Sequence, residues 1–149
     1  MSAKKIIFFI LIPAFFIITI GVLFILNRDK PASEVKIKIK TETKEIPVNN
    51  FRKNAEVIEN GAEYFVDKEE YNASYYPPNN EFVVTLLANQ DIENIRKEAE
   101  SDFINALGIS KEDACKLKVF LYVSAALTTD KSLYQNHGFS FCPGSKTFN

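Results

Sequence analysis

The sequence predicts an α+β protein. It would consist of an N-terminal transmembrane helix and a small domain with an antiparallel or mixed sheet, one main amphipathic helix and a short second helix. Three observations predict it: an uncharged run over residues 6–26, several short β-prone segments, and one apolar stripe at helical spacing near residues 91–107. The expected domains are an anchor at 1–27, a basic membrane-proximal stalk or linker at 28–54, and an α+β domain at 55–149.

The run from Ile6 to Leu26 holds 21 residues and no charged side chain. As a helix it would span about 31 Å, close to the thickness of the hydrocarbon core of a bilayer. A cleaved signal peptide has a shorter apolar core followed by small residues at the cleavage site, whereas here large apolar residues follow Gly21. We therefore expect an uncleaved single-pass anchor that contacts the lipid bilayer through residues 6–26.

The orientation of this anchor depends on two opposing signals. More lysines and arginines follow the run than precede it, which by the positive-inside rule alone would place the C-terminal domain in the cytoplasm. A short basic head at Lys4 and Lys5 is instead typical of an exported signal anchor, and a pair of cysteines favours an oxidising compartment. We expect the domain to lie outside the cytoplasm.

Charge is distributed unevenly along the chain. Residues 1–45 carry eight basic and four acidic side chains, a net of +4, and residues 46–149 carry ten and fifteen, a net of −5. Nucleic-acid binding needs clustered lysine and arginine, so the acidic domain predicts no nucleic-acid partner. Residues 35–40 alternate apolar and basic, as a half-exposed strand does. This strand is either a polybasic lipid contact or a solvated edge strand, and the neighbouring glutamates favour the solvated edge.

The middle of the chain predicts one hairpin between two irregular segments. Residues 46–54 read as a loop or turn region, and residues 57–66 as a hairpin in which Asn60 and Gly61 form a two-residue type I′ turn. Residues 67–80 read as turn-rich. The tyrosines of that last segment could form a recognition surface, although such rings more often pack on a sheet.

Residues 82–87 read as a strand covered on both faces, followed by the main helix over 91–107. We expect Asp91 to cap this helix and Gly108 to end it in a left-handed conformation. On its wet side we expect an ion pair between Glu93 and Lys97. A solvated acidic face is expected to hold Glu98, Glu100 and Asp102.

Ser110 predicts a second, short helix, because Asp113 follows at capping-box spacing. Residues 118–123 then read as a strand, so strand, helices and strand would form a β-α-β crossover. Residues 124–138 show weaker periodicity, and the alternating aromatic residues at 139–144 could add a last short strand.

Cys115 and Cys142 are the only cysteines. If the C-terminal segment folds back along the strand after Cys115, a disulfide between them is geometrically plausible in an oxidising compartment. Two unrelated thiols are the alternative.

The sequence predicts no catalytic, cofactor-binding or metal-binding residues, since it holds one histidine, two distant cysteines and no glycine-rich phosphate loop. We expect a membrane-anchored interaction or assembly module without enzymatic activity, with a protein partner of unknown identity. The alternative is a membrane-tethered thiol enzyme in which His137 activates Cys142.

Overall fold

The computed structural model describes residues 35–58 and 60–148, and the predicted anchor at 6–26 lies outside them. The described chain is a small α+β domain with one main helix, as predicted. It has two sheets and several short helices, where one sheet and one short helix were predicted. No helix among the described residues is both long and apolar enough to cross a membrane.

Among the described residues, seven strands and two α-helices follow one another, together with three short 3-10 helices. The strands are β1 (Lys36–Lys40), β2 (Glu45–Asn49), β3 (Glu56–Val57), β4 (Glu63–Asp67), β5 (Tyr71–Tyr76), β6 (Glu81–Leu86) and β7 (Val119–Val123). The helices are α2 (Ile92–Leu107) and α3 (Lys111–Ala114), with the 3-10 turns η1 (Phe51–Asn54), η2 (Pro77–Asn79) and η3 (Lys131–Tyr134).

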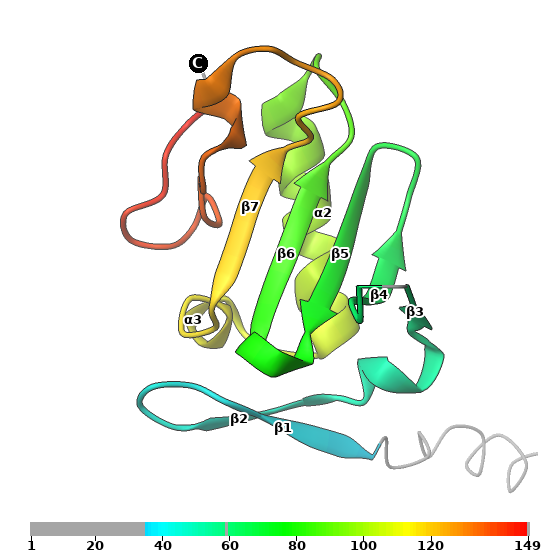
Figure 1. The fold of residues 1–149 in the computed structure, drawn as a ribbon. Coiled ribbons are helices and arrows are strands. Elements are labelled where there is room, and N and C mark those ends of the chain that lie inside the picture. The colour runs from blue at the N-terminus through cyan, green and yellow to red at the C-terminus, as the bar shows by residue number, and fades with distance from the viewer. Residues whose placement is uncertain (1–34, 59, 149) are drawn as a thin grey trace, which may run out of the picture. The chain divides into compact units, whose positions relative to one another are not determined.

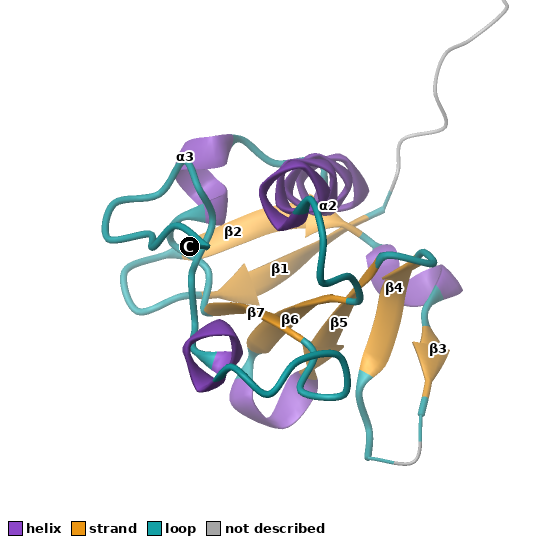
Figure 2. Cartoon of the chain, turned by 90° about the horizontal axis from the view of Figure 1, so that it is seen from above, coloured by secondary structure: helices purple, strands orange, loops and turns teal. Residues whose placement is uncertain are grey.

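The larger sheet is mixed, with strand order β3-β4-β5-β6-β7. Neighbouring strands are antiparallel except for β6 and β7, which are parallel and are joined through α2 and α3. The predicted β-α-β crossover is therefore confirmed. Both α-helices lie on one side of this sheet (Figure 2), so its opposite side faces the viewer in Figure 1.

Strands β1 and β2 pair antiparallel as a separate two-stranded sheet, which lies across one end of the larger sheet (Figure 1). The predicted first strand is confirmed. The loop or turn predicted over 46–54 is wrong at 46–49, which belong to β2, whereas residues 51–54 form the 3-10 turn η1. Ile39, Ile46 and Val48 are buried in the main hydrophobic core, so the apolar residues of both strands face inward. Pro47 is tolerated in β2 because it lies on the exposed side of a strand with only one neighbour.

The hairpin between β3 and β4 is confirmed, but its predicted two-residue turn is wrong. The amide of Ile58 donates to the carbonyl of Ala62 at 3.1 Å, which leaves three positions in the connection. Gly61 has φ +79°, a left-handed conformation that three-residue hairpin loops commonly place on glycine.

The turn-rich reading of residues 67–80 is wrong for β5, which is the central strand. Tyr71 and Tyr75 are buried against the core, and turns form only on either side of β5, at residues 68–70 before it and at η2 after it. The preference of aromatic residues for strands decides this segment over the local turn signals of asparagine and proline.

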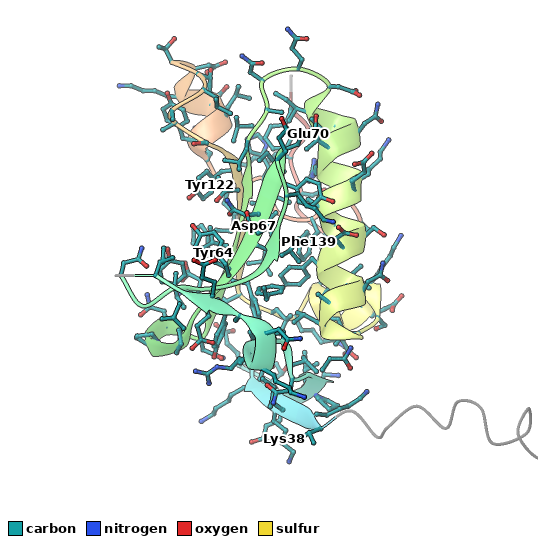
Figure 3. All side chains as sticks on the ribbon, turned by 90° about the vertical axis from the view of Figure 1, so that its right-hand side faces the viewer. Lys38, Tyr64, Asp67, Glu70, Tyr122 and Phe139 are labelled. Atoms are coloured by element: carbon teal, nitrogen blue, oxygen red, sulfur yellow. A yellow bond between two sulfur atoms is a disulfide. The ribbon has the colours of Figure 1, made fainter. Side chains whose placement is uncertain are left out.

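Helix α2 matches its prediction, and its buried side carries Ile95, Ala99 and Phe103. The ring of Phe103 packs against three other rings, those of Phe65, Phe82 and Phe139, at centroid distances of 4.9–5.7 Å. This aromatic cluster fills the space between the sheet and the helix. In Figure 3, Phe139 lies between them.

The ends of the helices agree with prediction in part. Gly108 ends α2 with φ +60°, and the hydroxyl of Ser110 caps α3 by accepting a hydrogen bond from the amide of Asp113 at 3.1 Å. Asp91 does not cap α2 through its side chain, because its carboxylate accepts a hydrogen bond from the Asn94 side chain instead.

The last strand predicted at 139–144 is absent from the described structure, where this segment forms turns. The position next to the outer edge of β7 is taken by Asn136 and His137. The Asn136 side chain bonds the backbone of Leu121 and Val119, and the amide of His137 donates to the carbonyl of Leu121 at 2.8 Å. These residues satisfy the edge of β7 without forming a regular strand.

Candidate functional site

The cysteine pair forms the predicted disulfide. Cys115, which directly follows α3, and Cys142 are bonded to each other, with their Cα atoms 5.5 Å apart. The bond ties the C-terminal segment to the crossover between α2 and β7. In this form neither sulfur is a thiolate.

His137, the predicted base of the alternative thiol enzyme, is buried beside the edge of β7. Its Nε2 atom lies 3.1 Å from the carbonyl oxygen of Ser132, and its ring stacks on Phe148 at a centroid distance of 3.8 Å. Its Nδ1 atom has no hydrogen-bond partner among the described residues. These contacts hold the imidazole in the packing of the C-terminal segment.

A buried ion pair that the sequence analysis missed fixes the same segment. Arg96 is 1 % exposed, and its Nε donates to Glu100 at 3.0 Å. Its remaining nitrogens donate to the backbone carbonyls of His137, Gly138 and Lys146 at 2.7–3.3 Å. The guanidinium therefore joins α2 to two separate stretches of the C-terminal segment.

The expected wet side of α2 is therefore wrong at Glu100, which is buried and accepts hydrogen bonds from the amide and hydroxyl of Ser140. The expected pair of Glu93 with Lys97 is also wrong. The Glu93 carboxylate lies 3.5 Å from Arg96 and accepts a hydrogen bond from the amide of Phe148. A buried carboxylate needs such partners because desolvation without them is costly.

The second candidate for a functional site is the face of the five-stranded sheet away from α2, which is more exposed than His137 and the Arg96–Glu100 pair. Strand register places Tyr64, Ser74, Val83 and Phe120 in one row across β4, β5, β6 and β7. A second row, by the same pairing, consists of Asp67, Asn72, Thr85 and Tyr122. We call these two rows the open face. In Figure 3, Tyr64 and Tyr122 lie on the side of the sheet away from α2.

A β-bulge between Tyr64 and Val66 helps to separate the two sides of the sheet. The extra residue, Phe65, packs its ring on Phe51 at 4.8 Å and on the central aromatic cluster, so two consecutive residues of β4 serve the core. Tyr64 and Asp67, on either side of this pair, are left for the open face.

The open face combines aromatic rings with small polar groups. Tyr64, Val83 and Tyr122 are half-buried, and Phe120 is 38 % exposed. Only Asp67 among the eight residues of the two rows is charged. The chemistry available to a ligand here is apolar contact, aromatic stacking and neutral hydrogen bonding.

The tyrosines of the open face lie close enough to affect one another. Burial raises the pKa of the Tyr64 phenol, and the neighbouring Tyr76, Tyr122 and Asp67 raise this pKa further. Tyr64 therefore remains a neutral hydrogen-bond donor at neutral pH. Tyr76 extends the aromatic surface at one end, where its hydroxyl accepts a hydrogen bond from the Asn60 side chain at 3.3 Å.

A hollow of about 400 Å³ lies between α2 and the C-terminal segment, lined by residues that include Lys97, Ser101, Lys111 and Phe141. Lys111 places its ammonium 5.2 Å from the centre of the Phe141 ring. The Glu100 carboxylate in this hollow is already engaged by Ser140. Across the described residues, no group of three or more histidine, cysteine, aspartate or glutamate side chains could hold a metal ion.

No protein-family model, curated protein or solved structure matches the chain. The open face could not be found from the sequence, because its members come from four strands and meet only through register. The one local signal was the aromatic content of β4, β5 and β7.

Proposed function

We propose that this chain is a single-pass, membrane-anchored interaction or assembly module whose domain lies outside the cytoplasm and has no enzymatic activity. The uncharged run at 6–26 supports the anchor. The disulfide between Cys115 and Cys142 supports an oxidising compartment.

The observation that carries the interaction role is the open face. Side chains such as Tyr64, Phe120 and Tyr122 keep part of their surface in water although they could form a core. Tyrosine and phenylalanine are enriched at protein–protein interfaces, because each supplies a large contact area at a small entropic cost. The near absence of charge suits a protein partner with a largely uncharged complementary surface.

The test is site-specific photo-crosslinking of the full-length protein in its native membrane. A photoreactive phenylalanine analogue at Phe120 or Tyr122 should crosslink one discrete partner. The same analogue at Ile109, near the end of α2, or at Phe148 should not, because both lie outside the open face. Crosslinks only to lipid, or equal yields at all four positions, would overturn the interaction role. An alkaline carbonate wash tests the anchor in the same membranes, and release of the full-length protein would overturn it.

The thiol enzyme remains the competing proposal and requires Cys142 to leave its disulfide. Separate Cys142→Ser and His137→Gln variants distinguish the two. A thiol enzyme loses its activity with either change, whereas an interaction module loses stability with Cys142→Ser and keeps its crosslinked partner with both.

A further inference from the structure

The exposed side of the β1–β2 sheet carries a row of three lysines. Lys36, Lys38 and Lys40 alternate with Ile37 and Ile39, and the isoleucines pack toward the core while the lysines are exposed. Alternate side chains on one face of a strand lie about 6.6 Å apart, so the three ammonium groups share one short line. In Figure 3, Lys38 points away from the rest of the domain.

Little on this side of the sheet neutralises the row. The residues paired with the three lysines in β2 are Asn49, Pro47 and Glu45. Only Glu45 is acidic, and it contacts Lys38 at 2.9 Å while both side chains remain more than half exposed. Three lysines against one glutamate leave a net charge of +2. Lys44 does not add to it, because its ammonium is paired with Asp113 at 2.7 Å.

The lysine row follows the predicted membrane span closely in the sequence. If residues 6–26 span the bilayer, eight residues separate Leu26 from Val35, where the described domain begins. Eight residues reach at most about 29 Å even when fully extended. On that condition, the length of the tether limits how far the first residue of the lysine row can lie from the end of the span.

We propose that Lys36, Lys38 and Lys40 form a contact for anionic phospholipid headgroups, which orients the domain on its own bilayer. This inference rests on the anchor of the proposed function. The ligand chemistry is the net negative charge of the phospholipid headgroup, which attracts exposed ammonium groups next to the surface. Residues 46–149 have a net charge of −5 and are repelled by the same surface. The domain would therefore turn the lysine row toward the membrane and its acidic part away from it.

Such an orientation would leave the open face available to a partner. The lysine row belongs to the two-stranded sheet, and the open face belongs to the larger sheet. The strands of the larger sheet extend away from the two-stranded sheet (Figure 1). Lipid contact and partner binding would therefore use separate surfaces of one domain.

The test uses the full-length protein reconstituted into vesicles of phosphatidylcholine, with and without phosphatidylglycerol. An amine-reactive, membrane-impermeant ester labels the outward-facing domains, and mass spectrometry gives the labelling rate of each lysine. Lys68, Lys97 and Lys131 serve as matched internal controls, since they are exposed lysines that lie on other elements.

Phosphatidylglycerol should slow the labelling of Lys36, Lys38 and Lys40 several-fold and leave the three controls unchanged. The protection should disappear at high salt, where surface charges are screened. Lys38→Gln removes one charge from the row but leaves Lys36 and Lys40 as reporters, and it should weaken the lipid contact that protects them by up to about fivefold. Glu45→Gln removes the acidic partner of Lys38 and should increase the protection.

Two results would overturn the lipid contact while leaving the anchor intact. In the first, the protein resists carbonate extraction, and its three lysines are labelled at equal rates in both kinds of vesicle. The other is equal protection of all six lysines, which would show contact without a preferred orientation. Protein that is released by carbonate would instead remove the anchor itself, and with it the reason for the lysine row to meet the membrane.

Discussion

The Nε atom of Arg96 lies 3.0 Å from the carboxylate of Glu100, one turn further along α2, and both side chains are excluded from solvent. Removing one member of a buried pair costs more than the pair contributes, because the other charge is left without compensation. Here the guanidinium also binds three backbone carbonyls of the C-terminal segment. The pair therefore links the stability of α2 to the position of that segment.

We expect Arg96→Ala to lower the free energy of unfolding by about 3–5 kcal/mol. Urea denaturation of the detergent-solubilised protein, followed by circular dichroism, measures this change. Lys97→Ala is the matched control, because this neighbouring side chain is exposed, and its effect should stay within about 0.5 kcal/mol. Equal effects of the two variants would mean that Arg96 is solvated in solution.

Phe103→Ala should destabilise the domain by about 3–5 kcal/mol, because it leaves a cavity at the centre of the aromatic cluster. Phe120→Ala also removes a phenyl ring, but from the open face, and should lower the free energy of unfolding by less than about 1 kcal/mol. The same denaturation experiment compares them. A large loss at Phe120 would show that the open face is covered in the folded protein.

Cys115 and Cys142 should react with a bulky maleimide only after reduction of the native protein. Two modifications without reductant would contradict the disulfide, and a reductant-sensitive dimer on a gel would mean that the cysteines join separate chains. The bond closes a loop with a sequence separation of 27. The double Cys115→Ser, Cys142→Ser variant should therefore lose about 3.5 kcal/mol of stability in the chain-entropy model.

Gly108→Ala should be more damaging than Gly61→Ala, although both glycines have positive φ values. Each change incurs about 1–2 kcal/mol for a left-handed alanine. A Cβ atom at Gly108 would also come within 2.5 Å of the Asn49 side chain, whereas one at Gly61 meets nothing within 4 Å. Adding Asn49→Ala should remove the excess cost at Gly108, which a double-mutant cycle measures. No recovery in the double variant would show that the clash with Asn49 is not the cause.

Stability should fall as the pH rises from 10 to 12, because of Tyr71. Burial and the hydrogen bond from its hydroxyl to Asp102, at 2.8 Å, raise the pKa of Tyr71 to about 12, whereas an unfolded tyrosine has a pKa near 10. Below pH 10 both states keep the proton, so this contribution to stability is complete. Above pH 10 the unfolded state loses the proton first, and the contribution is lost by about pH 12.

Denaturation at several alkaline pH values checks this prediction, and Tyr71→Phe should flatten the slope between pH 10 and 12. In an ultraviolet titration of the folded protein, Tyr71→Phe should remove one tyrosine from those that ionise near pH 12. An unchanged slope in Tyr71→Phe would assign the alkaline loss to other groups.

Features encoded by neighbouring residues could be read from the sequence. The stripe of Ile95, Ala99 and Phe103 specifies α2 because helical periodicity repeats within a few positions. Gly108 and Ser110 mark helix ends through local backbone chemistry. The disulfide was predictable only because the chain offers two cysteines and therefore one pairing.

Features that depend on distant partners could not be read in this way. Arg96 and Glu100 resemble ordinary solvated charges, since the carbonyls that bind Arg96 lie 41–50 positions further along and carry no side-chain signal. Strand β5 was hidden because the turn signals of Asn72 and Pro77 are local, whereas its strand character depends on having neighbours on both sides. The open face needs the register of four strands.

The sequence separation between Arg96 and its carbonyl partners also delays the completion of these contacts during synthesis. At about 5–20 residues per second, a ribosome needs roughly 2.5–10 s to make the 50 residues from Arg96 to Lys146. Until residues 137–146 are made, the guanidinium of Arg96 lacks its carbonyl partners, and β7, once made, lacks the cover that Asn136 and His137 give to its outer edge. In a newly made chain, the edge of β7 and the Arg96 side of α2 would therefore be exposed for a time. A chaperone could bind these surfaces during that stage.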